Sequence, residues 1–232
     1  MNGSVIVTGA AGGIGRAIVD RLKRAGATVI AADLSPGLAD LEGVTPVQVD
    51  LTTDEGVAAV VDTARDLEVP LVGLVNNAGI TRDARIVNMT DEDFRKVIDV
   101  NLGAAYRLAL PVAREMADGG SIVNIASRAY LGNFGQFNYT MSKGGIVGLT
   151  RALSLSLAPR VRVNAVAPGL IATEMALAIP EDVLAKMVAA IPLDRMGEPT
   201  DVAETIRFLL GPESSYITGE VLVVGGGRSL SR

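Results

Sequence analysis

The chain has 232 residues, a formal net charge of −5 and neither histidine nor cysteine. Without these two residue types, disulfides, thiolate nucleophiles, histidine bases and the usual zinc ligand sets are excluded. We therefore expect no metal and assign any proton transfer to Tyr, Lys, Asp, Glu, Ser or water. The acidic balance, with no clustered Lys/Arg tract, argues against a nucleic-acid partner.

The length and hydropathy of the chain indicate one domain that spans residues 1–232. A chain of this size can bury a single large core, and strand-like and helix-like segments alternate without a break. No apolar run approaches the roughly 18 to 20 residues that cross a bilayer, and the N-terminus lacks the basic and cleavage regions of a signal peptide. We therefore expect a soluble, cytoplasmic protein with no membrane partner.

The first 25 residues predict a strand, a glycine-rich turn and a helix. Ser4–Val7 is short and β-rich, whereas Arg16–Ala25 continues a run of apolar residues at helical spacing. Because glycine lacks a Cβ, the turn can approach a pyrophosphate, and the helix N-terminus favours the anion. Glycines also serve to pack a helix close to a strand, so the turn alone is weak evidence. The candidate cofactor-binding residues here are Thr8, Gly9, Gly13, Ile14 and Gly15.

Asp33 follows a second strand-like run, Thr28–Ala32, and stands twenty residues after Gly13. A carboxylate at this position can accept hydrogen bonds from the adenosine ribose hydroxyls of NAD. It would repel the 2′-phosphate of NADP by about 4 kcal/mol at roughly 4 Å and an effective dielectric of about 20. Arg16 is the nearby cation in sequence. The pattern favours NAD as the cofactor over NADP.

The remaining segments alternate between strands and helices. Such alternation predicts right-handed crossovers and a Rossmann-type, doubly wound α/β fold, with seven parallel strands and helices on both faces. Ligands bind such a sheet at the carboxyl ends of its strands, where Gly9, Asp33, Asp50, Asn76 and Ser127 fall. The further strands are expected at Thr45–Val49, Val72–Val75, Ser121–Ile125, Val161–Val166 and Glu220–Val224, and the further helices at Glu55–Asp66, Asp91–Met116 and Gln136–Leu157.

Tyr139 and Lys143 are four residues apart in a helical stretch, so they share one face of that helix. A tyrosine is one of the few proton carriers that this composition leaves available. A solvated pair on a helix surface would show the same spacing, so this motif alone leaves its function open.

Together these motifs resemble the short-chain dehydrogenase/reductase family, in its short single-domain type, over essentially the whole chain. Within that family the segments Asn76–Asp83 and Ser215–Gly219 are most similar to 3-oxoacyl-(acyl-carrier-protein) reductase-like members. The resemblance implies an enzyme that transfers hydride between a nicotinamide and an alcohol or carbonyl carbon. The matching residues are Thr8, Gly9, Gly13, Gly15, Asp33, Asp50, Leu51, Asn76 to Gly79, Asn101, Ser127, Tyr139, Lys143, Pro168, Gly169 and Thr173.

The resemblance also assigns four catalytic residues. Tyr139 would exchange a proton with the substrate oxygen, Ser127 would hold that oxygen, and Asn101 would order a water that links Lys143 to solvent. A free tyrosine has a pKa near 10, and we expect Lys143 and the oxidised nicotinamide to lower it to about 7 to 8. Eleven residues separate Ser127 from Tyr139, one fewer than is usual in the family, which puts Ala126 at the usual position. We expect Ser127 to fill the role because the loop is shorter.

The remaining cofactor contacts are likewise implied by the resemblance. Pro168 to Thr173 would run beside the nicotinamide, with the Ile171 main chain and the Thr173 hydroxyl as its contacts. Residues of about 170–195 form either a mobile apolar lid or a packed surface helix. The full set outside the glycine turn is Asp33, Asp50, Leu51, Asn77, Ala78, Gly79, Tyr139, Lys143, Pro168, Gly169, Ile171 and Thr173.

The aromatic residues Tyr130, Phe134 and Phe137 lie close to Tyr139 in sequence. They suggest an apolar alcohol, ketone or acyl-thioester substrate, although core packing or a subunit interface explains them equally well. Family members are commonly tetramers, so the resemblance implies a homotetramer.

Three functions stay open at this point. The first is an NAD(H)-dependent oxidoreductase that interconverts a secondary alcohol or 3-hydroxyacyl group with its ketone. The second is an NADPH-dependent 3-oxoacyl-carrier-protein reductase of fatty acid synthesis, although such enzymes usually carry a basic residue in the turn where Gly12 stands. The third is a non-catalytic dinucleotide sensor or scaffold, which would bind NADH without turnover. Epimerases and dehydratases with the same Tyr/Lys pair are less favoured, because this chain has no length for their substrate domain.

Overall fold

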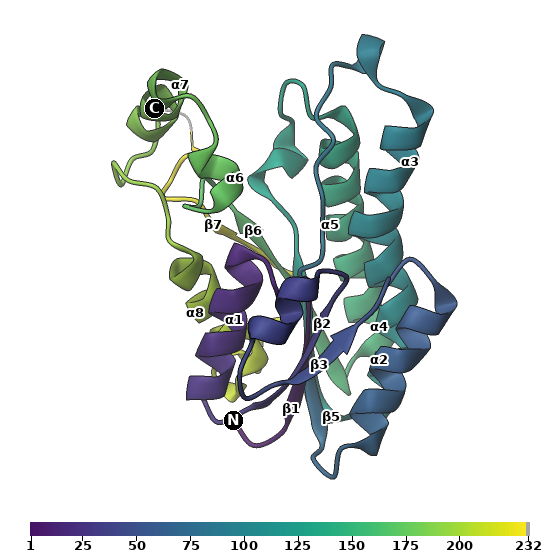
Figure 1. Ribbon diagram of the computed structural model, residues 1–232. Helices are drawn as coiled ribbons and strands as arrows, with labels where there is room; N and C mark the ends of the chain where they lie inside the picture. Colours follow the sequence, from purple (N-terminus) through teal and green to yellow (C-terminus); the bar gives the residue numbers. More distant parts are fainter. Residues whose placement is uncertain (231–232) are drawn as a thin grey trace.

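The computed structural model describes residues 1–230, apart from the side chain of Met175, and is built on a seven-stranded parallel sheet (Figure 1). The order of the strands is β3-β2-β1-β4-β5-β6-β7, so the winding direction reverses between β1 and β4. This arrangement confirms the predicted doubly wound fold, in which ligands bind at the reversal point. The strands are β1 (Ser4–Thr8), β2 (Thr28–Asp33), β3 (Thr45–Gln48), β4 (Leu71–Asn76), β5 (Met116–Ile125), β6 (Val161–Pro168) and β7 (Val221–Val224).

Two layers of helices cover the sheet (Figure 1). On one face, α1 (Gly13–Arg24) packs beside α8 (Pro199–Leu210), and on the other lie α2 (Asp54–Asp66), α4 (Ala104–Glu115) and α5 (Phe137–Leu157). Each face has its own apolar cluster, because every central strand sends buried side chains to both sides. The shorter helices α3 (Asp91–Ile98), α6 (Glu174–Leu177) and α7 (Glu181–Ala189) rise above the carboxyl edge of the sheet.

Helix α8 is absent from the sequence prediction, yet its signals are present. Pro199 stands in the first turn, where a missing N–H costs nothing, and Glu198 and Asp201 form a capping box. Val202 and Ile206 are fully buried against the sheet. The capping residues and the apolar residues at helical spacing could therefore have predicted this helix from the sequence.

The helix expected over Asp91–Met116 is interrupted. It divides into α3, a π-helical turn at Asp99–Gly103, and α4. The wider turn holds Asn101, which is only 2% exposed. Asn101 Oδ1 accepts a hydrogen bond from Ile80 N (2.8 Å), and its Nδ2 donates to Ile80 O (3.0 Å) and Ser142 Oγ (3.0 Å). The interruption thus ties the loop after β4 to helix α5, as π-turns often do near functional sites.

Asn76, which the sequence places at a strand end, points into the sheet. Its Nδ2 donates to Asn124 Oδ1 (2.8 Å), and Asn124 Nδ2 donates to Thr150 Oγ1 (2.9 Å). These buried polar groups satisfy one another, so they fix β4, β5 and α5 together.

No helix within residues 1–230 combines the length and apolar character that a membrane span needs. Over the same residues, no cluster of three or more acidic side chains is arranged to hold a metal ion.

Candidate active site

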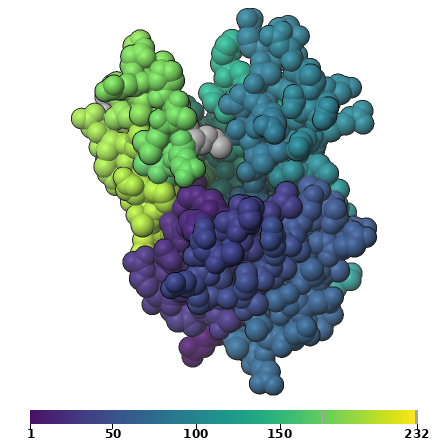
Figure 2. Space-filling model, viewed as in Figure 1, coloured from purple at the N-terminus to yellow at the C-terminus, as the bar shows by residue number. Residues whose placement is uncertain are grey.

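A cleft of about 1000 Å³ opens at the carboxyl ends of the strands. Figure 2 shows this hollow above the glycine turn, between the lobe that contains α6 and α7 and the lobe that contains α3. Its walls come from six parts of the chain that are far apart in sequence. The lining includes residues 11–16, 33–35, 49–52, 77–81, 125–129 and 168–171, with Tyr139, Lys143 and Thr173.

The glycines of the turn do two different things. A Cβ on Gly15 would lie 2.0 Å from Gly9 O, and Gly9 itself has a φ of +62° and would place a Cβ 2.8 Å from Ala78 Cα. These two positions are therefore required for the close approach of α1 to the loop after β4. In contrast, Gly12 and Gly13 face the cleft, with no neighbouring atom closer than 3.6 Å and 3.4 Å to a Cβ placed there. The open space beside them and the following helix N-terminus fit the pyrophosphate of a dinucleotide.

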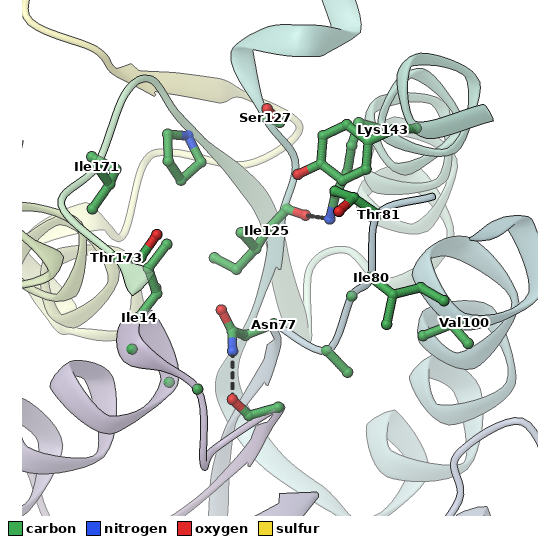
Figure 3. Close-up of a pocket in the computed structure, with 18 of the residues that line it drawn as sticks. Ile14, Asn77, Ile80, Thr81, Val100, Ile125, Ser127, Lys143, Ile171 and Thr173 are labelled. Carbon is green, nitrogen blue, oxygen red and sulfur yellow. Dashed lines mark hydrogen bonds between the residues drawn. The ribbon is translucent and has the colours of Figure 1, made fainter. Parts of the chain in front are cut away.

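Thr8 and Asn77 hold this turn from behind. Thr8 Oγ1 accepts hydrogen bonds from the main-chain N–H groups of Asn77 and Ala78, each at 3.0 Å. Asn77 Nδ2 donates to Thr8 O (3.0 Å) and Gly9 O (2.9 Å), so its amide spans the two loops (Figure 3). Thr8 is buried, and its side chain positions the backbone rather than facing a ligand.

Asp33 is fixed at the other end of the turn. Its Oδ2 accepts a hydrogen bond from Ala11 N and its Oδ1 accepts one from Ser35 N, both at 2.9 Å. The carboxylate lines the cleft where the adenosine half of a dinucleotide would lie. Arg16 is engaged elsewhere, because it donates to Ala11 O (2.8 Å) and Gly37 O (2.9 Å) and lies 3.6 Å from Asp40.

Asp50 and Leu51 form the lip beside this end of the cleft. Asp50 accepts hydrogen bonds from the hydroxyl (2.7 Å) and main-chain N–H (2.9 Å) of Thr52, and these bonds hold the pKa of the Asp50 carboxyl below its usual value. Leu51 is buried beneath the lip.

Lys143 lies at the bottom of the catalytic end. Its Nζ is buried and donates to Ile125 O (2.7 Å), as Figure 3 shows. Burial without a carboxylate partner lowers the pKa of Lys143 to about 8. A Cβ on Gly79 would lie 3.3 Å from Asn101 Oδ1 and 3.5 Å from Lys143 Nζ, so the small residue lets the loop lie directly over both groups.

The Tyr139 ring lies 5.6 Å from Lys143 Nζ, measured to the ring centroid. Burial raises the pKa of the phenol, a hydrogen bond with Ser127 acts in the lowering direction, and the negative charge of Asp83 raises it further. The expected lowering is therefore not a property of the protein alone, because the ammonium of Lys143 is directed at Ile125 O. The positive charge of an oxidised nicotinamide would act in the lowering direction.

The structure places Ser127, and not Ala126, beside Tyr139. Ala126 is 1% exposed and belongs to an apolar cluster with Ala105, Ile146 and others. The Ser127 hydroxyl makes the hydrogen bond with Tyr139 noted above and also accepts from Ala129 N (3.1 Å), where a short 3-10 turn begins.

The opposite wall is formed by the segment after β6. Gly169 lies so close to Gly225 that a Cβ would be 2.8 Å from its Cα. Ile171 is buried, and the Thr173 side chain lies opposite Gly13, so that Pro168 to Thr173 faces the glycine turn across the cleft (Figure 3). Ala176, Ile179 and Met187 continue this wall. Apolar side chains of the 170–195 segment thus face the cleft, while its closure as a lid stays a prediction.

Three aromatic residues that precede Tyr139, namely Tyr130, Phe134 and Phe137, are not among the residues that line the cleft. Phe134 is 87% exposed beneath the guanidinium of Arg85, and Phe137 packs on Phe94 with ring centroids 5.9 Å apart. Tyr130 packs against the apolar cluster around Ala126. The structure therefore favours packing over substrate contact for Tyr130 and Phe137.

Two arginines that the sequence analysis missed line the cleft instead, Arg128 and Arg228. Arg128 follows Ser127 directly, and Arg228 follows three consecutive glycines after β7. The position of Arg128 next to Ser127 could have indicated its place in the cleft. Nothing in the sequence indicates that Arg228, about a hundred residues later, lies in the same cleft.

Comparisons with known proteins agree with this geometry. A family model described as "Enoyl-(Acyl carrier protein) reductase" matches residues 9–229. A 3-oxoacyl-(acyl-carrier-protein) reductase of Thermotoga maritima is 42% identical over 96% of each chain, and an acetoacetyl-CoA reductase of an Acinetobacter species is 40% identical, also over 96% of each. A solved glucose/ribitol-type short-chain dehydrogenase/reductase from Brucella melitensis matches with a TM-score of 0.95 at 33% identity, over 99% of this chain and 98% of that one.

The fold, the glycine turn and the whole-length similarity lead to one conclusion. The chain belongs to the short-chain dehydrogenase/reductase family, and it is an oxidoreductase that uses a nicotinamide dinucleotide to interconvert CH–OH groups and carbonyls.

Proposed function

We propose that this protein interconverts a secondary alcohol and its ketone with NAD(H), with Tyr139 as the general acid and base. The observation that carries the proposal is the convergence of Ser127, Tyr139 and Lys143 in the cleft, at the carboxyl end of β5. Each of these groups touches or approaches the position of the substrate oxygen.

The residues divide the work of proton transfer. In the oxidation direction, the Tyr139 phenolate takes the proton of the substrate hydroxyl, and in reduction the phenol returns it. Ser127 donates a hydrogen bond to the same oxygen and holds it near the phenol. A bound nicotinamide would supply the hydride chemistry, since the hydride leaves the alcohol carbon with both electrons of the C–H bond in oxidation and is returned in reduction. Lys143 supplies positive charge beneath the phenol, and Asn101 fixes the loop that covers that charge.

The residues on this chain fit NAD better than NADP. Gly12 and Gly13 would hold the pyrophosphate, Asp33 would accept from the ribose hydroxyls, and Asp50 and Leu51 would border the adenine. Asp33 is held by two main-chain N–H groups, so it cannot easily turn away from a 2′-phosphate. Arg16 also lines the cleft, but its guanidinium already donates to the carbonyls of Ala11 and Gly37 and lies 3.6 Å from Asp40.

A second candidate function is the reduction of 3-oxoacyl thioesters with NADPH. It is favoured by the relatives named 3-oxoacyl-(acyl-carrier-protein) reductase and acetoacetyl-CoA reductase. The position of Asp33 argues against its cofactor, although not against its acyl substrate.

We extend the proposal to the remaining properties. The protein works as one domain over residues 1–232 and as a homotetramer in the cytoplasm. Exposed apolar side chains on α4 and α5, namely Tyr106, Leu110, Met141 and Leu155, support such an assembly.

The decisive experiment compares NADH with NADPH in the reduction of a short 3-oxoacyl thioester and of simple ketones, followed by nicotinamide absorbance. Turnover with NADH preferred supports the main proposal, and preference for NADPH supports the second candidate. Tight NADH binding without turnover of any carbonyl would indicate a sensor.

A further inference from the structure

Arg128 and Arg228 bring two positive charges to the substrate side of the cleft. Arg128 begins the 3-10 turn after Ser127, and Arg228 comes from the loop after β7, more than ninety residues further along the chain. Both side chains are half-buried. A surface arginine is normally solvated, so two of them gathered in one cleft call for a physical explanation.

Within the part of the chain that the structure describes, neither arginine is paired with an acidic side chain. Arg128 Nε is buried and has no hydrogen-bond partner in that part of the chain. Arg228 lines the same cleft as Arg128, and both burial and the positive charge of Arg128 lower the pKa of its guanidinium.

The acidic residues of the cleft are engaged or remote. Asp33 and Asp50 lie at the adenosine end, where their oxygens accept main-chain hydrogen bonds. Asp99 pairs with Arg107 at 2.7 Å, and Glu174 is exposed on α6. A bound anion would therefore satisfy the open donor of Arg128 and relieve the repulsion between the two arginines.

We propose that Arg128 and Arg228 bind the free carboxylate of the substrate, which makes this protein a dehydrogenase of short hydroxy acids and a reductase of the matching oxo acids. This inference rests on the proposed function. Arginine suits the task because its planar fork of N–H donors matches a carboxylate. The carboxylate itself does not react; the hydride and proton transfers at the alcohol carbon and oxygen are those described above.

The position of Arg128 limits how long the substrate can be. Its Cα is about 3.8 Å from that of Ser127, which holds the reacting oxygen. Ser127, Tyr139 and both arginines line the same cleft, so the proposed substrate carries its carboxylate only a few bonds from the alcohol carbon. The phosphate of a carrier arm is separated from its thioester by the length of pantetheine, so it does not fit the same placement.

The test compares (R)- and (S)-3-hydroxybutanoate with their methyl esters and with 3-hydroxybutanoyl-CoA, all with NAD. We expect the wild-type protein to prefer one enantiomer of the acid over its ester in kcat/KM. In Arg128→Gln and Arg228→Gln, the acid-to-ester ratio of kcat/KM should fall about 10- to 100-fold, mainly through KM. Arg128→Lys should keep part of the preference. Arg85→Gln, whose side chain lies over Phe134 outside the cleft, is the matched control.

The possible outcomes distinguish a failure of the carboxylate site from a failure of the proposed oxidoreductase function. Turnover of esters or thioesters with no preference for the free acid overturns the carboxylate site and leaves the oxidoreductase proposal intact. A loss of CoA-thioester turnover in the arginine variants, without a change in the acid-to-ester ratio, overturns it in favour of a phosphate. If no substrate reacts, the proposed function fails, and calorimetry of butanoate binding to wild type and Arg128→Gln still decides whether the arginines hold a carboxylate.

Discussion

The two ends of the cleft are built in opposite ways. At the cofactor end, the functional groups are backbone atoms and a carboxylate whose hydrogen bonds are already made, as Thr8, Asn77 and Asp33 show. At the substrate end, the groups are titratable side chains whose pKa values are shifted by burial: Lys143, Tyr139 and Arg228, with Arg128 in the same cleft. The first end is preorganised before a ligand binds, whereas the second keeps a buried donor, Arg128 Nε, without a hydrogen-bond partner in residues 1–230.

The largest effect should come from removing the proton carrier at the substrate end. Tyr139→Phe keeps the ring and loses only the hydroxyl, so we expect kcat to fall about 10²- to 10⁴-fold while NADH still binds. Steady-state rates and the fluorescence of bound NADH measure the two properties. Tyr216→Phe, whose side chain is fully exposed and lies outside the cleft, is the control. Near wild-type turnover in Tyr139→Phe would remove the basis of the proposed mechanism.

At the cofactor end, we expect a substitution that adds a methyl group to a packed glycine to lower the stability of the fold. Gly15→Ala places a methyl group on Gly9 O, so we expect the free energy of unfolding to drop by about 3 kcal/mol. Gly37→Ala, outside the cleft, meets no atom closer than 3.4 Å and should leave the free energy of unfolding nearly unchanged. Urea unfolding of both variants is the measurement. Equal stability of the two would mean that the tight turn is not required by packing.

The charge of Lys143 provides a test that uses pH. Its pKa is lowered to about 8 in the folded protein and returns toward its ordinary value of 10.5 on unfolding. Between these two values the unfolded chain binds the extra proton, so the free energy of unfolding rises with pH in this window. Relative to Lys143→Met, the wild-type protein should gain about 2 to 3 kcal/mol between pH 7 and pH 10.5. A difference that stays constant with pH would show that Lys143 titrates normally.

The smallest effect concerns the choice of cofactor. Asp33→Asn removes the negative charge but keeps a hydrogen-bonding side chain, so the NADP-to-NAD ratio of kcat/KM should rise about 10- to 100-fold, since solvent screens part of the repulsion. Asp40→Asn, which removes the carboxylate nearest Arg16 outside the cleft, is the comparison variant. An unchanged ratio in Asp33→Asn would show that the carboxylate does not select the cofactor.

The sequence predicted some parts of the structure better than others. Strands β1 to β7 and the glycine turn were predicted because apolar runs and glycines encode local structure. Helix α8 was missed although its capping residues were present. The interruption at Asn101 was visible only as a polar residue in a helix, because its partners, Ile80 and Ser142, come from other segments.

By itself, the sequence determined the alternation of strands and helices, the glycine turn and the position of Tyr139 and Lys143 one turn apart on a helix, since each depends on residues that are close along the chain. Only the tertiary structure decided that Ser127 rather than Ala126 lies beside Tyr139, that Lys143 is directed at Ile125 O, and that Arg228 joins Arg128. The physical reason is that burial, pKa and charge pairing depend on which distant segments the packed sheet brings together.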